Sequence, residues 1–94
     1  MLTFTRHLAV DYGQAGIRCN CVWPGWIDTG LNQSIFTAMG MTDAEVATLV
    51  QQTVPMNRQE GPGEVAAAIA FRCSDDASYV SGPALVVDRG QMAL

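Results

Sequence analysis

The pattern of apolar and polar positions predicts two short buried strands. Residues 17–23 are mostly apolar and are bounded by Gly16 and by Pro24-Gly25, which is typical of a strand buried on both faces of a parallel sheet. Because proline cannot donate to a strand ladder, we expect this strand to end at Trp23. A second short apolar run, residues 84–88, predicts the other strand.

Three further segments have helical patterns. Residues 1–12 contain good helix formers and stop at Gly13, which is placed as a helix C-cap. Thr42 opens a second helix with a capping box, and apolar residues follow at helical spacing until Pro55. Pro62 suits the first turn of a third helix over residues 61–73. The predicted buried face of this helix is Val65, Ala66, Ile69, Ala70 and Cys73.

Residues 24–40, which follow the first strand, form a candidate ligand loop. A strand, a helical crossover and a second strand imply a parallel, right-handed unit. Open α/β sheets bind ligands just outside the carboxyl ends of their strands, and this segment is long for a plain connection. We therefore expect an irregular functional loop or lid here. Two strands alone are marginal, so the sheet needs further strands or a partner.

Composition narrows the class of protein. Ninety-four residues make one small domain at most, and 49% hydrophobic residues indicate a globular chain. The net charge is −4, and the five basic residues, all Arg, form no patch, so we expect no nucleic-acid partner. No apolar run reaches membrane-spanning length, and the N-terminus is too polar for a signal peptide. Three cysteines suit a reducing compartment, which predicts a cytoplasmic protein.

The sequence offers weak metal or acid–base candidates. Cys19 and Cys21 point to the same face of the first strand, so a metal or redox pair is conceivable. They lack a second cysteine pair, and His7 is the single histidine, so we interpret them as small buried hydrophobes and expect no metal. The acidic residues at helix ends are interpreted as caps or solvated charges: Asp43, Glu45, Asp75 and Asp76.

Short motifs follow one another along nearly the whole chain. They are Thr5-Arg6-x-Leu8-Ala9 with Asp11-Tyr12, Ile17-Arg18-x-Asn20, Pro24-Gly25-Trp26-Ile27-x-Thr29, Pro62-x-Glu64-Val65-Ala66, Ser74-Asp75, Tyr79-Val80-Ser81-Gly82 and Val87-Asp88. In this order they resemble the C-terminal portion of the classical short-chain dehydrogenases/reductases. The resemblance implies an α/β fold, the C-terminal part of a Rossmann-like doubly wound parallel sheet. Residues 1–94 would be a partial domain without a complete dinucleotide-binding half.

In that family the loop after the sixth strand closes over the nicotinamide end of NAD or NADP. The resemblance implies that the Ile27 backbone and the Thr29 hydroxyl hydrogen-bond the carboxamide. An ordinary turn, in which Thr29 caps the next segment, is the alternative. The implied cofactor residues are Pro24, Gly25, Ile27 and Thr29. The implied substrate-pocket residues are Trp26, Leu31, Phe36 and Met39.

The family's catalytic residues are missing from this sequence. The family uses Tyr-x-x-x-Lys with an upstream Ser, whereas this chain has no Lys, and neither Tyr12 nor Tyr79 fits the pattern. The Gly-rich turn that binds the pyrophosphate is also missing. The chain would thus be a C-terminal fragment of an NAD(P)-dependent oxidoreductase that acts on a small alcohol/carbonyl pair. This fragment would not be catalytically competent alone. A truncated, non-enzymatic assembly or interaction module without cofactor binding is the alternative.

Two residues depart from the family pattern. Arg72 stands where the family usually has a buried Leu, so it must reach solvent, find an acid or mark a relaxed constraint. Arg89 replaces a Gly after the last strand, so the turn there can differ. The fifth helix and last strand are the family's usual oligomer contacts. Residues 1–12 and 84–94 are therefore the implied homo-oligomer interface.

Overall fold

The computed structural model describes residues 1–93, in which the three predicted helices and two predicted strands are confirmed. In chain order the elements are α1 (Leu2–Tyr12), β1 (Cys21–Pro24), α2 (Gly30–Ala38), α3 (Asp43–Thr53), α4 (Pro62–Cys73) and β2 (Ala84–Val87). Single 3-10 turns follow α1, α4 and β2 at Gly13–Ala15, Asp75–Ala77 and Gln91–Ala93. None of the helices within residues 1–93 is long and apolar enough to cross a bilayer.

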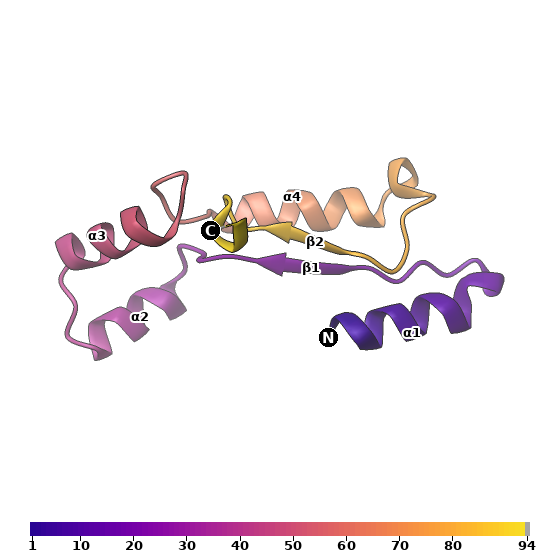
Figure 1. The fold of residues 1–94 in the computed structure, drawn as a ribbon, viewed down its shortest axis with the longest axis horizontal. Coiled ribbons are helices and arrows are strands. Elements are labelled where there is room, and N and C mark those ends of the chain that lie inside the picture. Colours follow the sequence, from indigo (N-terminus) through magenta and orange to yellow (C-terminus); the bar gives the residue numbers. More distant parts are fainter. Residues whose placement is uncertain (94) are drawn as a thin grey trace.

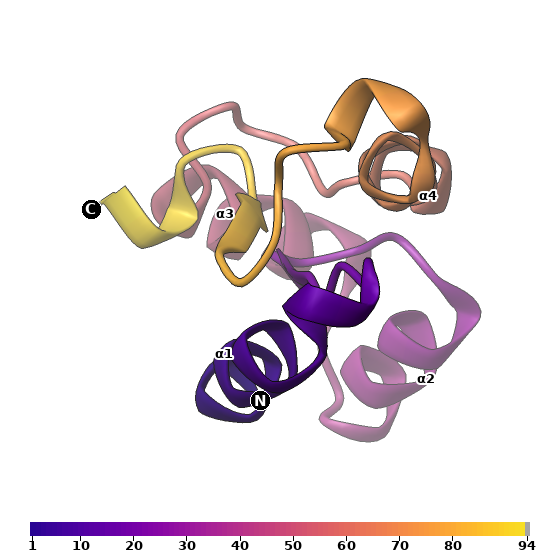
Figure 2. The ribbon, with the colours of Figure 1, turned by 90° about the vertical axis from the view of Figure 1, so that its right-hand side faces the viewer.

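The two strands form the predicted parallel pair, in which Cys21 lies opposite Ala84 and Pro24 lies opposite Val87. The chain passes through α2, α3 and α4 between the strands, as a parallel connection requires. Figures 1 and 2 show α1 and α4 on opposite sides of the strand pair. This arrangement is a partial α/β fold of the Rossmann type.

The prediction for the first strand was wrong at both ends, since β1 begins at Cys21 and includes Pro24. The bonds to the β2 side come from alternate residues: Cys21 N–H donates to Pro83 O (3.4 Å), and Gly25 N–H donates to Val87 O (2.9 Å). The nitrogen of Pro24 therefore faces the free edge, where a missing donor breaks no bond. This geometry explains why the strand continues through a proline.

The helix α2 lies inside the segment that the sequence predicted to be irregular. Thr29 is its N-cap, and its Oγ1 accepts a hydrogen bond from Asn32 N–H at 3.3 Å. Leu31, Ile35 and Met39 then repeat at helical spacing, but all three are exposed, at 72%, 46% and 67%. The capping threonine and this spacing were the available signals for a helix.

The apolar core of the described residues is very small. Val50, Val54 and Ala77 are the buried hydrophobic residues within 1–93. The radius of gyration is 16.3 Å, whereas a compact domain of this length has about 12 Å. The predicted buried face of α4 is largely open, since Ile69 and Cys73 are both exposed. A sheet of two strands is too narrow to cover the helices that lie on its two faces. The sequence had predicted that such a sheet would be marginal alone.

Candidate functional site

The candidate loop begins where β1 ends, and Gly25 fixes its position. The Gly25 N–H donates to Val87 O, the last residue of β2. A Cβ added at Gly25 would lie 2.8 Å from both Cα and Cβ of Asp88. Asp88 is itself buried, and its carboxylate accepts bonds from Gly90 N–H (3.0 Å) and Met92 N–H (2.7 Å). A side chain at position 25 would thus push the loop away from the carboxyl end of the sheet.

A second set of backbone hydrogen bonds joins the loop to the segment before α4. Ile27 and Glu60 form an isolated parallel bridge. Glu60 N–H donates to Trp26 O at 2.8 Å, and Asp28 N–H donates to Glu60 O at 2.7 Å. Because these bonds flank Ile27, the N–H and C=O of Ile27 itself point away from Glu60. The loop is therefore held along one side and open along the other.

The open side of the loop presents two hydrogen-bond donors. Within residues 1–93, no hydrogen bond uses the Ile27 N–H, while Ile27 O accepts from Asn32 Nδ2 at 2.6 Å. The Thr29 oxygen accepts from Asn32 N–H, so the hydroxyl hydrogen remains available to donate. A carbonyl oxygen has a second lone pair, so Ile27 O can accept another bond. These groups fit a planar amide, which needs both a donor and an acceptor.

Glu60 places an acidic side chain beneath the loop. It is 2% exposed, and its Oε2 has no hydrogen-bond partner within residues 1–93. Burial raises the pKa of the Glu60 carboxyl, the Gly25 backbone amide opposes this rise, and the nearby Glu64 and Asp88 carboxylates reinforce it. The sequence did not single out Glu60, because a bridge between distant residues leaves no local pattern.

An arginine cluster holds the start of α4 beside the loop. Arg58 donates from Nη2 and Nη1 to the two Glu64 oxygens at 2.9 and 3.0 Å, and Arg89 pairs with the same carboxylate. The Gly61 backbone N–H, followed by Arg58, lowers the pKa of Glu64. Arg89, whose side chain is 6% exposed, reaches Glu64 from a left-handed backbone (φ 55°). Arg89, which stands where the family pattern has a Gly, therefore joins the turn after β2 to the first turn of α4.

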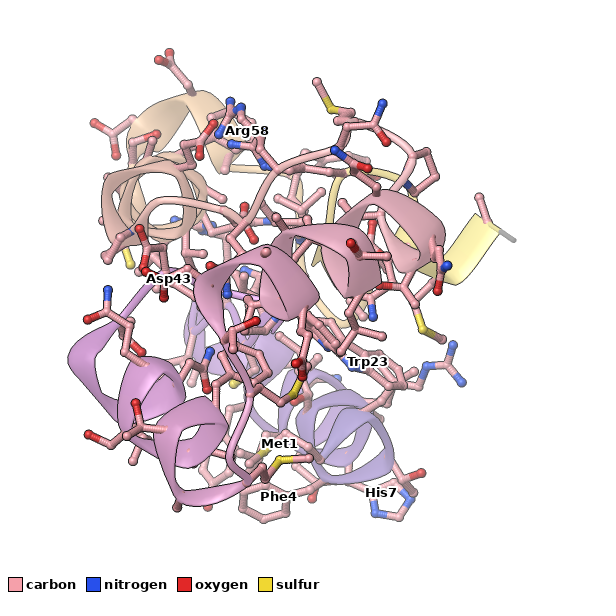
Figure 3. All side chains as sticks on the ribbon, turned by 90° about the vertical axis from the view of Figure 1, so that its left-hand side faces the viewer. Met1, Phe4, His7, Trp23, Asp43 and Arg58 are labelled. Atoms are coloured by element: carbon pink, nitrogen blue, oxygen red, sulfur yellow. The ribbon has the colours of Figure 1, made fainter. Side chains whose placement is uncertain are left out.

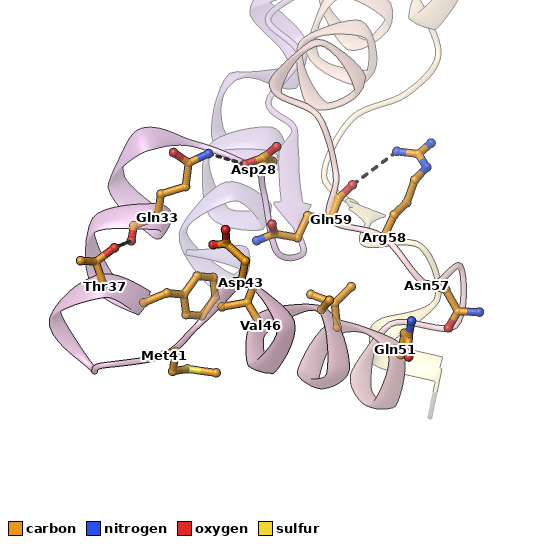
Figure 4. A pocket seen from close by; sticks show the side chains of 13 residues that line it. Asp28, Gln33, Thr37, Met41, Asp43, Val46, Gln51, Asn57, Arg58 and Gln59 are labelled. Carbon is orange, nitrogen blue, oxygen red and sulfur yellow. Dashed lines mark hydrogen bonds between the residues drawn. The ribbon is translucent and has the colours of Figure 1, made fainter.

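Two of the four predicted substrate-pocket residues come together. The Trp26 and Phe36 rings pack with centroids 5.7 Å apart and planes tilted by 50°. Phe36 lines a cavity of about 620 Å³ between α2 and α3, shown in Figure 4. Leu31 and Met39 do not line this cavity and lie exposed on α2. The polar side of the cavity includes Asp28, Gln33, Thr37, Asp43, Arg58 and Gln59.

Comparison with known proteins gives a consistent family for residues 1–92, which match a family model described as Enoyl-(Acyl carrier protein) reductase. The chain is 40% identical over 87 residues to Oxidoreductase UcpA of Escherichia coli, covering 92% of this chain and 33% of that protein. It is 37% identical over 94 residues to 2-(R)-hydroxypropyl-CoM dehydrogenase of Xanthobacter autotrophicus, covering all of this chain and 36% of the relative. The chain thus spans about a third of the length of these curated relatives.

Solved structures agree with this result. A short chain dehydrogenase family protein from Francisella tularensis superimposes with a TM-score of 0.86 at 30% identity, over 99% of this chain and 40% of that one. 4-Hydroxyisoleucine dehydrogenase complexed with NADH superimposes with a TM-score of 0.87 at 25% identity, over 99% of this chain and 36% of that one. The described residues therefore have the fold of a part of such proteins, somewhat more than a third of their length.

Proposed function

Because the chain belongs to the short-chain dehydrogenase/reductase family, we propose that residues 24–29 supply the nicotinamide-side loop of an NAD(P)-dependent oxidoreductase. The parent reaction would interconvert a small alcohol and a carbonyl compound. The presence of NADH in a solved relative and the dehydrogenase names of several relatives support this proposal. Three free cysteines suit a reducing compartment, so we place the protein in the cytoplasm.

The open side of the loop is the observation that carries the proposal. Ile27 N–H and Thr29 O–H would donate to the carboxamide oxygen, and Ile27 O would accept from its amino group. Pro24 and Gly25 hold these groups at the carboxyl end of the sheet. Nicotinamide supplies hydride chemistry when bound, and the chain's part is to orient the ring. Trp26 and Phe36 would form part of the substrate wall, with Leu31 and Met39 on the adjoining helix.

The 94-residue chain would not catalyse the reaction alone. Its sequence contains no Lys, and the Gly-rich turn and Ser/Tyr/Lys set that the family uses are absent from it. We therefore propose that the chain acts as the C-terminal part of a longer polypeptide. The pure 94-residue chain should give no NAD(H)- or NADP(H)-dependent turnover, and measurable turnover would contradict the proposal.

The intact mass of the native product from its source cells and a pair of threonine variants would test the loop assignment. We expect a mass well above that of 94 residues. In that native polypeptide, Thr29→Val should weaken NADH binding about tenfold, because a hydrogen bond to the carboxamide is lost. Thr42→Val is the matched control, since Thr42 caps α3 by the same bond to Glu45 N–H, outside the loop. Equal NADH affinities for the two variants would contradict the assignment.

The second candidate function is a non-enzymatic assembly module. Exposed apolar side chains favour it: Phe4 and Val10 on α1 are 62% and 78% exposed, and Val86 on β2 is 46% exposed. Figure 3 shows Phe4 at the margin of the molecule. Residues 1–12 and 84–94 would then form a homo-oligomer interface. Size-exclusion chromatography with and without NADH separates the candidates, because a module would self-associate regardless of the nucleotide.

A further inference from the structure

The cavity between α2 and α3 has an apolar floor and a polar rim. Phe36 and Val50 line it from the two helices, and Val50 is 5% exposed. Its volume of about 620 Å³ falls within the range of small-molecule pockets, about 300–1,000 Å³. Asp28 also lines the cavity and lies between Ile27 and Thr29, so a ligand that contacts Asp28 would lie beside the loop proposed to hold nicotinamide.

Four polar side chains converge in this cavity. Figure 4 shows Asp28, Gln33, Asp43 and Gln59 with their polar ends turned toward the same space. Gln33 Nε2 donates to Asp28 Oδ1 at 2.9 Å, which uses one amide hydrogen and one carboxylate oxygen. Gln59 accepts from Arg58 only through its backbone oxygen, so within residues 1–93 its side-chain amide makes no hydrogen bond. The Asp43 carboxylate likewise accepts none within these residues, so the cavity offers both donors and acceptors to a ligand.

The charge of the lining does not suit an anionic ligand. Two carboxylates, Asp28 and Asp43, line the cavity, whereas Arg58 is its single cation within residues 1–93. Both Nη atoms of Arg58 already donate to the Glu64 carboxylate, at 3.0 and 2.9 Å. A ligand with a carboxylate or a phosphate would therefore meet like charge, and the guanidinium that could bind it is already engaged.

Hydroxyl groups fit the polar rim better than apolar groups or amines do. A purely apolar ligand would remove water from Asp43 and Gln59 without replacing the lost hydrogen bonds. An ammonium group has only donors, so it pairs with a carboxylate but not with the N–H groups of an amide. A hydroxyl group both donates and accepts, so neighbouring hydroxyls can bond a carboxylate and an amide together. The C–H groups of the same molecule would pack on Phe36 and Val50.

We propose that this cavity binds the substrate and that the substrate is a polyhydroxylated compound of sugar-alcohol size, held by Asp43 and Gln59 above the apolar floor. The inference rests on the proposed function, because it takes the cavity as the substrate pocket of that oxidoreductase. Asp43 would accept hydrogen bonds from two hydroxyls, and Gln59 would donate to one hydroxyl and accept from another. Neither residue was among the four substrate-pocket residues expected from the sequence.

Three six-carbon probes test the substrate class on the native polypeptide: D-sorbitol, 2-hexanol and hexylamine. They have the same number of carbon atoms and differ in hydroxyl number and charge. Isothermal titration calorimetry without cofactor should give about tenfold tighter binding for sorbitol than for the other two. With the oxidised cofactor present, sorbitol should also have a higher kcat/KM than 2-hexanol. Equal or tighter binding of 2-hexanol or hexylamine would overturn the proposal.

Two acidic residues in the first turn of α3 provide a matched pair of variants. Asp43 lines the cavity and Glu45 does not, yet both variants remove one negative charge from the same helical turn. Asp43→Ala should weaken sorbitol binding about tenfold, because a charge-assisted hydrogen bond is lost, whereas Glu45→Ala should leave the affinity unchanged. Circular dichroism checks that both variants keep their helices. Equal sorbitol affinities of the two variants would overturn the assignment of Asp43.

The same measurements separate this inference from the proposed function. If the native polypeptide binds NADH and oxidises 2-hexanol but not sorbitol, the oxidoreductase assignment holds and the polyhydroxylated substrate is wrong. If it binds sorbitol through Asp43 but does not bind NADH, the cavity takes a polyhydroxylated ligand and the proposed function is wrong. Binding of neither sorbitol nor NADH would contradict both.

Discussion

The two sides of β1 differ sharply in how much of their backbone is paired within residues 1–93, although each has buried side-chain atoms without a partner, Glu60 Oε2 at the loop and Arg72 Nε at the free edge. At its carboxyl end, Gly25 packs against Asp88, and Ile27 forms a backbone bridge with Glu60. The Glu64 carboxylate nearby pairs with two arginines. Along its free edge, backbone groups face an open groove and Arg72 Nε has no partner within residues 1–93. The chain therefore contains what is needed to shape its loop but not what is needed to close its sheet.

This difference indicates where changes will act on this chain alone. Interactions at the loop are internal, so substitutions there alter the free energy of unfolding directly. The groove depends on atoms that the described chain does not supply, so most substitutions there should act mainly on association. The variants below are ordered by expected effect.

The largest effect is expected for Arg18→Leu, the exception on the groove side. Its guanidinium donates to four carbonyl oxygens at the end of α4 and in the following turn, and the variant leaves these oxygens without that donor. We expect the free energy of unfolding to fall by roughly 3 kcal/mol. Urea denaturation followed by circular dichroism measures this fall, with exposed Arg6→Leu as the control. Similar midpoints for the two variants would show that Arg18 does not hold this segment.

Gly25→Ala comes next, because the new Cβ would meet the Asp88 backbone. Overpacking of this kind costs about 2 kcal/mol. Gly30→Ala is the control, since a Cβ there meets nothing within 4 Å and alanine favours the helix. Tryptophan fluorescence during urea unfolding reports both variants. If Gly25→Ala is as stable as Gly30→Ala, the loop is not held by this contact.

Thr29→Val should have a smaller effect, the loss of one helix cap. The expected cost is about 1 kcal/mol, and Thr42→Val should cost about the same because both threonines cap through one backbone bond. Thermal unfolding compares them. A much larger loss at Thr29 would mean that the hydroxyl has a structural role beyond α2.

Glu60→Gln should change the free energy of unfolding least of the four variants. The change should be negligible at low pH and measurable at neutral pH. Burial raises the pKa of Glu60 in the folded chain, so the folded state binds this proton more tightly than the unfolded state does. The protonated Glu60 carboxyl therefore contributes to the free energy of unfolding below the ordinary pKa of Glu. This contribution is lost as the pH rises through the raised pKa of Glu60 in the folded chain. The variant should remove that loss, whereas exposed Glu45→Gln should not. Parallel pH profiles for wild type and Glu60→Gln would contradict this reasoning.

Local signals in the sequence predicted three of the four helices, whereas the roles of the site residues stay predictions. The N-cap at Thr42 and the proline at position 62 correctly marked α3 and α4, although of the predicted capping box only the bond from Glu45 N–H to Thr42 Oγ1 forms. The helix α2 was missed because its apolar residues, Leu31 among them, were interpreted as pocket lining. The bridge between Ile27 and Glu60 joins residues far apart in the chain, so no periodicity could reveal it.

The outcome for Arg72 shows a second limit. The sequence offered solvent, an acid or a relaxed constraint, and the structure shows an amide oxygen of Asn20 instead. A side chain's counter-ion depends on every element packed around it, and here part of that surrounding is an open groove. The physical cost of a buried arginine was predictable, but its partner was not.

Pro24 has a consequence for any strand that joins β1. Its nitrogen faces the free edge and carries no hydrogen, so an incoming strand finds no donor at that position. Pairing would proceed along Asn20 and Val22 and then stop one residue before the loop. The proline thus ends sheet growth along this edge, so an incoming strand would leave the backbone of residues 25–29 unpaired on that side.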